Sequence, residues 1–136
     1  MPIEFDIGTL SMTEIFRLQN LLSQELSRRF ETSAAICFTD IVGSTPYFAR
    51  FGDVAGRQMQ QLHIDQLSRA LAEHGGRIVD TAGDGAVTFF PSTNAAAAAM
   101  CQLQVQLSSE NAHRERDDQV VLGIGLHWGR VLTDGV

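Results

Sequence analysis

Two aspartates that follow strand-like runs are the residues of this chain best suited to chemistry. Asp40 comes just after the apolar run Ala34–Phe38, and a Gly-Ser-Thr turn follows it closely. Asp84 lies between two glycines, at a tight turn that joins two further strand-like runs. Two neighbouring carboxylates repel each other unless a cation lies between them, and their hard oxygen atoms suit Mg²⁺ or Mn²⁺. The pattern therefore predicts a phosphate site that uses two divalent metal ions.

The turn after Asp40 has the composition of a phosphate-binding loop. Sheet pairing cannot satisfy every main-chain N–H group in residues 41–43, so we expect these groups to face an anion. The hydroxyl groups that follow add donors, and the glycine permits close approach of a phosphate. The residues expected to bind substrate in this turn are Ile41, Val42, Gly43, Ser44 and Thr45.

Each aspartate also has a simpler explanation when it is taken alone. Asp40 could cap the helix that follows, and an Asp-Gly dipeptide such as Asp84-Gly85 is a common hairpin turn without any function. Only the pair of acids, on strands that are expected to be neighbours, favours a metal site.

Composition allows one domain and excludes some functions. The chain has 136 residues, 44% of them hydrophobic, which is enough for a single core. Its formal net charge of −6 argues against binding to a nucleic-acid backbone. Cys37 and Cys101 lie in apolar runs without metal-ligand spacing, so we expect two buried, unpaired thiols. No run reaches the roughly 18 apolar residues of a membrane span, and the acidic N-terminus does not resemble a signal peptide, so we expect a cytoplasmic protein.

Hydrophobic periodicity predicts a helix followed by the order β-α-β-β-α-β. This is the split βαβ or ferredoxin-like arrangement, an α+β fold with helices on one face of the sheet. We expect an N-terminal segment, residues 1–32, and a domain, residues 33–136. The predicted helices span residues 11–30, 54–74 and 93–107, and the predicted strands span 34–40, 77–82, 86–90 and 120–127.

The N-terminal helix has an apolar stripe with helical spacing, and Ser11 with Glu14 could form a capping box at its start. Two interpretations of the stripe stay open: packing on its own domain, or pairing with the same helix of a second chain. In the next helix, His63 and His74 fall on the apolar side, and we expect core or cap histidines there.

Three segments, in the same order along the chain, resemble motifs of the class III nucleotidyl cyclases, the adenylate and guanylate cyclase family. Phe38–Thr45 is similar to the first metal motif of that family, and Gly83–Gly85 to the second. Gly123–Gly129 is similar to its later strand-and-turn motif. The resemblance covers about residues 33–136.

This resemblance implies a site and a reaction. Two Mg²⁺ or Mn²⁺ ions would be bound by Asp40, Asp84 and the main-chain carbonyl of Ile41. The ribose 3′-hydroxyl would attack the α-phosphorus, pyrophosphate would leave, and the turn at residues 42–45 would hold the triphosphate. A homodimer is also implied, because the family builds each active site between two chains.

The chain departs from the family pattern at the base-reading position, where it has Asp80. Adenylate cyclases usually carry a lysine there and guanylate cyclases often a glutamate. A carboxylate cannot donate to adenine N1, but it can accept from guanine N1–H and N2–H₂. Asp80 is therefore either a base-reading residue or a solvated strand residue in a site that reads the base elsewhere.

A second departure concerns catalysis. The family places a second base-reading residue, and an Asn and Arg that stabilise the transition state, beyond the position that matches Val136. Nothing in these 136 residues replaces them. We therefore expect either a fragment that lacks its C-terminal strands and is inactive alone, or a catalytically incomplete chain.

The favoured function is an adenylate cyclase that converts ATP to cyclic AMP and pyrophosphate in cyclic nucleotide signalling. The first alternative is a guanylate cyclase, which only Asp80 supports. The second is a degenerate cyclase-like module that binds a nucleotide, or dimerises, for regulation.

Overall fold

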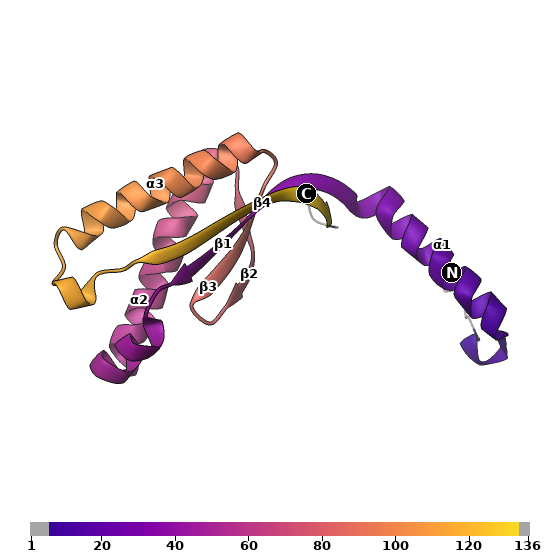
Figure 1. Cartoon of the computed structure of the whole chain (residues 1–136), viewed down its shortest axis with the longest axis horizontal. Helices are drawn as coiled ribbons and strands as arrows, with labels where there is room; N and C mark the ends of the chain where they lie inside the picture. The colour runs from indigo at the N-terminus through magenta and orange to yellow at the C-terminus, as the bar shows by residue number, and fades with distance from the viewer. Residues whose placement is uncertain (1–5, 134–136) are drawn as a thin grey trace. The chain divides into compact units, whose positions relative to one another are not determined.

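The computed structural model describes residues 6–133 (Figure 1). They fall into two compact units, which are described separately below. One contains the residues up to Thr32 together with those from Arg130 onward, and the other spans Ser33–Gly129. Within residues 6–133, no helix combines the length and the apolar character that a bilayer crossing requires.

The first unit is built around helix α1 (Met12–Phe30), which follows a short 3₁₀ helix, η1 (Ile7–Thr9). The Ser11 hydroxyl accepts a hydrogen bond from the Glu14 N–H at 3.2 Å, and the Glu14 carboxylate accepts one from the Ser11 N–H at 3.3 Å. The predicted capping box is therefore confirmed. None of the residues of α1 is buried.

Four strands form one sheet in the order β2-β3-β1-β4. Their bounds are Glu31–Ile41 for β1, Arg77–Ala82 for β2, Gly85–Phe90 for β3 and Leu122–Leu132 for β4. Strand β3 pairs antiparallel with both β1 and β2. This order confirms the predicted split βαβ arrangement, because β3 lies between β1 and β2.

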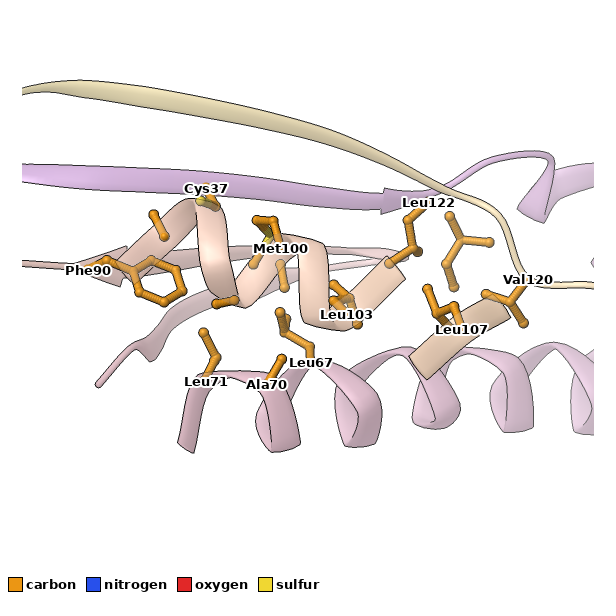
Figure 2. Packing of buried hydrophobic residues seen from close by; sticks show 14 of the residues in the cluster. Cys37, Leu67, Ala70, Leu71, Phe90, Met100, Leu103, Leu107, Val120 and Leu122 are labelled. Atoms are coloured by element: carbon orange, nitrogen blue, oxygen red, sulfur yellow. The ribbon is translucent and has the colours of Figure 1, made fainter. Parts of the chain in front are cut away.

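Two helices, α2 (Ser44–His74) and α3 (Thr93–Asn111), cover one face of this sheet (Figures 1 and 2). The alternation of side chains along β1 explains which face is covered, since Cys37 is buried while Phe38 is 52% exposed. The opposite face, which carries Phe38, is called the open face below. The core between helices and sheet includes Ala35, Cys37, Leu67, Ala70, Phe90, Leu103, Leu107 and Leu122.

Helix α2 begins ten residues earlier than the sequence pattern predicts. The irregular segment expected before residue 54 is helical from Ser44, with a break at Gly52, whose φ of 88° is non-helical. Pro46 made a helix here look unfavourable from the sequence. Proline is nevertheless tolerated in the first turn of a helix, because its missing N–H would have no intrahelical partner there.

Three further expectations are corrected. Helix α3 extends to Asn111 instead of ending at Leu107, and β4 continues to Leu132 instead of ending at His127. Cys37 is buried as predicted, whereas Cys101 is exposed, because it lies on the outer side of α3. Both thiols are free.

Candidate active site

The pairing of β1 with β3 brings the two acid-bearing segments together. Asp40 lies opposite Gly85 in the antiparallel register, and the Ile41 N–H donates to the Asp84 carbonyl at 3.4 Å. A Cβ atom at Gly85 would lie 3.6 Å from Oδ1 of Asp40, so the carboxylate rests against the hairpin backbone. Asp40 and Asp84 therefore share one end of the sheet.

The side chain of Asp84 also contacts the turn that follows β1. The Ser44 hydroxyl donates to Oδ2 of Asp84, and Nε2 of Gln60 donates to Oδ1 at 2.5 Å. Ser44 is the first residue of α2, so the second acid lies directly beside the start of this helix. Ser44 and Asp84, which are forty positions apart in the sequence, thus belong to one polar cluster.

The turn itself places a helix N-terminus at the site. Gly43 is the N-cap residue of α2 and adopts a left-handed conformation with φ of 74°, which favours glycine. No atom lies within 4 Å of the position that a Cβ of Gly43 would occupy, so the turn is open on that side. The first N–H groups of a helix lack intrahelical partners and carry partial positive charge. Ser44 and Thr45 therefore offer donors suited to a phosphate.

The N–H groups before this turn do not face an anion, which corrects part of the sequence interpretation. Val42 donates its N–H to the Val121 carbonyl at 2.8 Å, and the N–H of Ile41 is held by Asp84 as described above. Sheet pairing thus extends one residue beyond the end of β1. The donors available to a phosphate begin at Gly43.

The oxygen atoms at this site fit a divalent cation of the Mg²⁺ type. Among residues 6–133, no three His, Cys, Asp or Glu side chains lie close enough together to hold a metal ion. Mg²⁺ usually takes one or two carboxylates and completes its shell with water and substrate phosphate oxygens. Asp40 and Asp84, with main-chain carbonyls beside them, match that donor set.

Asp80 lies on the open face, one row away from Asp40. It is opposite Val87 in the β2–β3 register, and Val87 is opposite Phe38 in the β1–β3 register. Asp80 is exposed, and its Oδ1 accepts a hydrogen bond from the N–H of Thr81 at 2.8 Å. It is the acid of β2 that shares a face with Asp40.

Comparison with known proteins identifies the family. The sequence model for the adenylate and guanylate cyclase catalytic domain matches residues 27–136, which is most of the chain. The chain belongs to this family. No curated protein sequence matches it.

Solved structures of cyclases have the same fold. A bacterial light-regulated adenylyl cyclase is 20% identical with a TM-score of 0.70, and the match covers 75% of this chain and 56% of that one. An adenylate/guanylate cyclase/hydrolase from Silicibacter pomeroyi is 25% identical with a TM-score of 0.66, over 77% and 61% of the two chains. The guanylyl cyclase Cya2 is 19% identical with a TM-score of 0.65, over 75% and 56%. The chain spans about half the length of the first solved proteins that it matches.

In this cyclase segment, His63 links α2 to both acid-bearing segments. It is 1% exposed, and its Nε2 lies 2.8 Å from Oγ1 of Thr39, the residue before Asp40. Burial lowers the pKa of His63, while a hydrogen bond to the main chain of Asp84 and the charges of Asp40 and Asp84 oppose that shift. The expected core position is confirmed, but the contacts of His63 with the site were not anticipated.

Gln60 was also missed from the sequence. It lies one turn before His63, and Figure 1 shows α2 running along the sheet from the turn that holds the site. One signal in the sequence could have indicated these contacts. Two polar residues at positions i and i+3 on the sheet-facing side of a helix each need a hydrogen-bond partner when they are buried.

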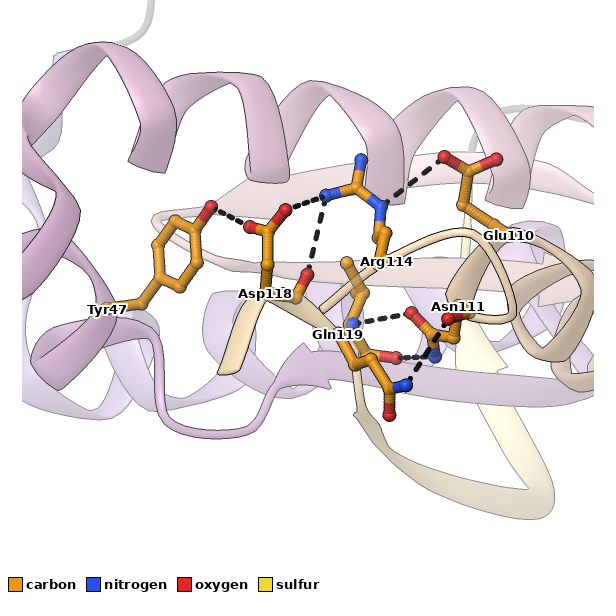
Figure 3. A network of polar contacts seen from close by, with 7 residues as sticks. Tyr47, Glu110, Asn111, Arg114, Asp118 and Gln119 are labelled. Carbon is orange, nitrogen blue, oxygen red and sulfur yellow. Dashed lines mark hydrogen bonds and ion pairs between the residues drawn. The ribbon is translucent and has the colours of Figure 1, made fainter. Parts of the chain in front are cut away.

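A second polar network holds the start of α2 from the other side (Figure 3). The Tyr47 hydroxyl donates to Oδ1 of Asp118, and Nη1 of Arg114 donates to Oδ2 of Asp118 at 3.1 Å. Arg50 and Asp117 form an ion pair at 2.8 Å. Burial, followed by the hydrogen bond to Asp118, raises the pKa of Tyr47. The network ties the first turns of α2 to the segment between α3 and β4.

Proposed function

We propose that this segment belongs to an adenylate cyclase, which converts ATP to 3′,5′-cyclic AMP and pyrophosphate. The observation that carries the proposal is the β1–β3 register, which sets Asp40 beside the Asp84 hairpin at the N-terminus of α2. Two acids and a phosphate-binding turn at one point are the groups that a triphosphate with divalent cations requires.

Each residue has a role in this proposal. Asp40, Asp84 and the main-chain carbonyl of Ile41 would hold two Mg²⁺ or Mn²⁺ ions. When bound, these ions activate the ribose 3′-hydroxyl and neutralise the charge of the triphosphate. The turn at residues 42–45 binds the triphosphate through the N–H groups that begin at Gly43 and through the hydroxyls of its last two residues.

The reaction forms a bond between the ribose 3′-oxygen and the α-phosphorus. The bond from that phosphorus to the oxygen of the departing pyrophosphate breaks, and the 3′-hydroxyl proton passes to solvent water. The turn, and the two acids through the cations that they would hold, would keep the attacking and leaving oxygens in line, and such positioning is a large part of catalysis in phosphoryl transfer.

A second copy of the chain is the partner in this proposal. The open face carries Asp40, Asp80 and the exposed ring of Phe38, so a partner on this face would enclose the nucleotide between two chains. An exposed aromatic ring beside polar site residues is typical of an interface.

The test of the metal site is a Mn²⁺ titration of the 136-residue chain, followed by electron paramagnetic resonance. We expect Asp40→Ala to weaken Mn²⁺ binding by about tenfold or more, since one of two carboxylate ligands is lost. Asp53→Ala is the matched control, because Asp53 is an exposed acid of α2, just after the break at Gly52, and makes no hydrogen bond with Asp40 or Asp84 within residues 6–133. Equal Mn²⁺ affinities in all three proteins would contradict the proposal.

Asp80 supports guanylate cyclase activity as the second candidate. Its exposed carboxylate on the open face could accept from guanine, which has donors where adenine has none. We nevertheless expect ATP to be preferred, because the side chain is shorter than the glutamate of guanylate cyclases and already bonds to Thr81.

The test is the ratio of kcat/KM for ATP and GTP. It is measured in a longer protein, in which this segment is followed by the Asn and Arg that stabilise the transition state in the family. The ratio is then measured for Asp80→Lys. A carboxylate left unpaired costs about 1–3 kcal/mol, so a base-reading Asp80 would discriminate by about tenfold or more. A preference for GTP that Asp80→Lys reverses would make the guanylate cyclase the correct assignment. Nucleotide binding without turnover would favour the regulatory module.

A further inference from the structure

Helix α2 directs two polar side chains at the acid-bearing segments, and the proposed reaction uses neither of them. Gln60 and His63 are three residues apart, so they lie on the same face of the helix. Both belong to the unbroken part of α2 that follows Gly52. This part packs on the core through Leu67 and Ala70, which makes it a fixed support for whatever it contacts.

Gln60 contacts an acid of the site directly. Its Nε2 donates to Oδ1 of Asp84 at 2.5 Å, and the other oxygen of that carboxylate accepts from Ser44. A carboxylate can only accept, so the amide must present its NH₂ group here. Ser44 belongs to the turn that would receive phosphate, whereas Gln60 stands outside that turn. Gln60 is therefore the contact that can hold the Asp84 carboxylate in one orientation when phosphate occupies the turn.

His63 fixes the backbone on both sides of the acid pair. Its ring bonds to the buried hydroxyl of Thr39, next to Asp40 on β1, and lies near the main chain of Asp84 in the hairpin, which acts to raise the pKa of His63 against the effect of burial. Thr39 is 1% exposed, so this hydrogen bond is shielded from water. One imidazole thus connects the two strands that each deliver an acid.

We propose that Gln60 and His63 are positioning residues of the cation site. They hold Asp40 and Asp84 close together and correctly oriented before a divalent cation binds, against the repulsion of two neighbouring carboxylates. The inference rests on the proposed metal site. Partners that orient metal ligands typically contribute 10- to 100-fold to metal affinity, about the same range that we expect here.

The experiment measures Mn²⁺ affinity by electron paramagnetic resonance in the 136-residue chain, with thermal unfolding in EDTA measured in parallel. Gln60→Met keeps the length of the side chain and removes the donor. We expect it to weaken Mn²⁺ binding by about tenfold and to leave the metal-free unfolding temperature nearly unchanged. Gln61→Met is the matched control, since Gln61 bonds to Asp65 and not to an acid of the site.

His63 is tested by a pair of variants. His63→Leu removes the hydrogen bond to Thr39, and His63→Gln can restore it, so we expect the second variant to recover part of the lost Mn²⁺ affinity. If His63→Leu does not fold, Gln60→Met still tests the positioning role, because Gln60 is only partly buried and its substitution should leave the fold intact.

Two results would overturn the inference, and they differ in what else they contradict. Wild-type Mn²⁺ affinity in Gln60→Met, together with loss of binding in Asp84→Asn, would leave the metal site intact and remove the positioning role. Equal Mn²⁺ affinity in wild type, Asp40→Ala and Asp84→Asn would contradict the proposed metal site itself, and the inference with it.

Discussion

At the scale of single residues, the candidate site consists of the two acids and of the side chains that contact Asp84 and the turn at residues 42–45. Asp84 is held by Ser44 and Gln60, and the start of α2 is held by the contact of Tyr47 with Asp118. Each of these contacts joins a residue of α2 to a distant segment. The turn at residues 42–45, which we propose binds phosphate, is therefore fixed by hydrogen bonds on both sides.

Tyr47 gives a prediction that a single spectroscopic signal can test. It is the only tyrosine of the chain, so the absorbance of tyrosinate reports this group alone. Burial and the nearby carboxylate raise its pKa, so we expect a titration midpoint above the usual value of about 10. Asp118→Asn should lower the midpoint only in part, because burial is the larger cause.

The sign of the effect on stability follows from the same shift. A raised pKa in the folded state means that the protonated phenol is favoured by folding, so this stabilisation is complete below pH 10 and is lost as the pH rises through the folded-state pKa. Tyr47→Phe should remove that part of the alkaline decrease in the free energy of unfolding. An identical alkaline decrease in wild type and Tyr47→Phe would contradict the assignment.

At the scale of elements, helix α2 connects the site to the core. Its start adjoins the turn proposed to bind phosphate, its middle carries Gln60 and His63, and its last turns pack on α3. The break at Gly52 divides the first part from the rest, and packing between Phe48 and Gly56 joins the two parts again.

This packing predicts a strong effect of a small substitution. A Cβ at Gly56 would lie 2.3–2.5 Å from ring atoms of Phe48, so Gly56→Ala must displace the ring and the short helix that bears it. We expect a loss of about 1–3 kcal/mol in the free energy of unfolding, measured by urea denaturation. Phe48→Leu in the same chain should restore part of the loss. A double variant no more stable than Gly56→Ala would show that the ring is not the cause.

At the scale of the whole molecule, the open face of the sheet is the expected site of association with a second chain. Phe38 lies on an inner strand of the sheet, in the same row as Val87 and Asp80. Burying the Phe38 ring in a dimer interface would contribute about 1.5–3 kcal/mol to the free energy of association. This corresponds to a factor of about ten or more in the dissociation constant.

Sedimentation equilibrium with and without ATP tests this association. We expect Phe38→Ser to shift the chain toward the monomer by about tenfold in dissociation constant. Val54→Ser is the control, because Val54 is an exposed residue of α2 away from the open face. Loss of association in the control alone would place the interface on the helical side.

The sequence by itself determined the family and the element order, and it singled out Asp40 and Asp84 as the candidate acids. These depend on local signals: the alternation of apolar residues, the glycines at the turns, and motifs whose members are close along the chain. The connection between Phe38–Thr45 and the Asp84 hairpin also followed, because the split βαβ order makes β1 and β3 neighbours.

Only the tertiary structure decided which donors remain available and which residues support the site. Pairing of Val42 with Val121 removes an N–H that the local pattern left free, and the partner is 79 positions away in the chain. The sequence places His63 on the apolar side of its helix but shows no partner for it or for Gln60, and only the sheet brings Thr39 and Asp84 within hydrogen-bond distance of them. Hydrogen bonds between distant segments are set by packing geometry, which no spacing along a helix encodes.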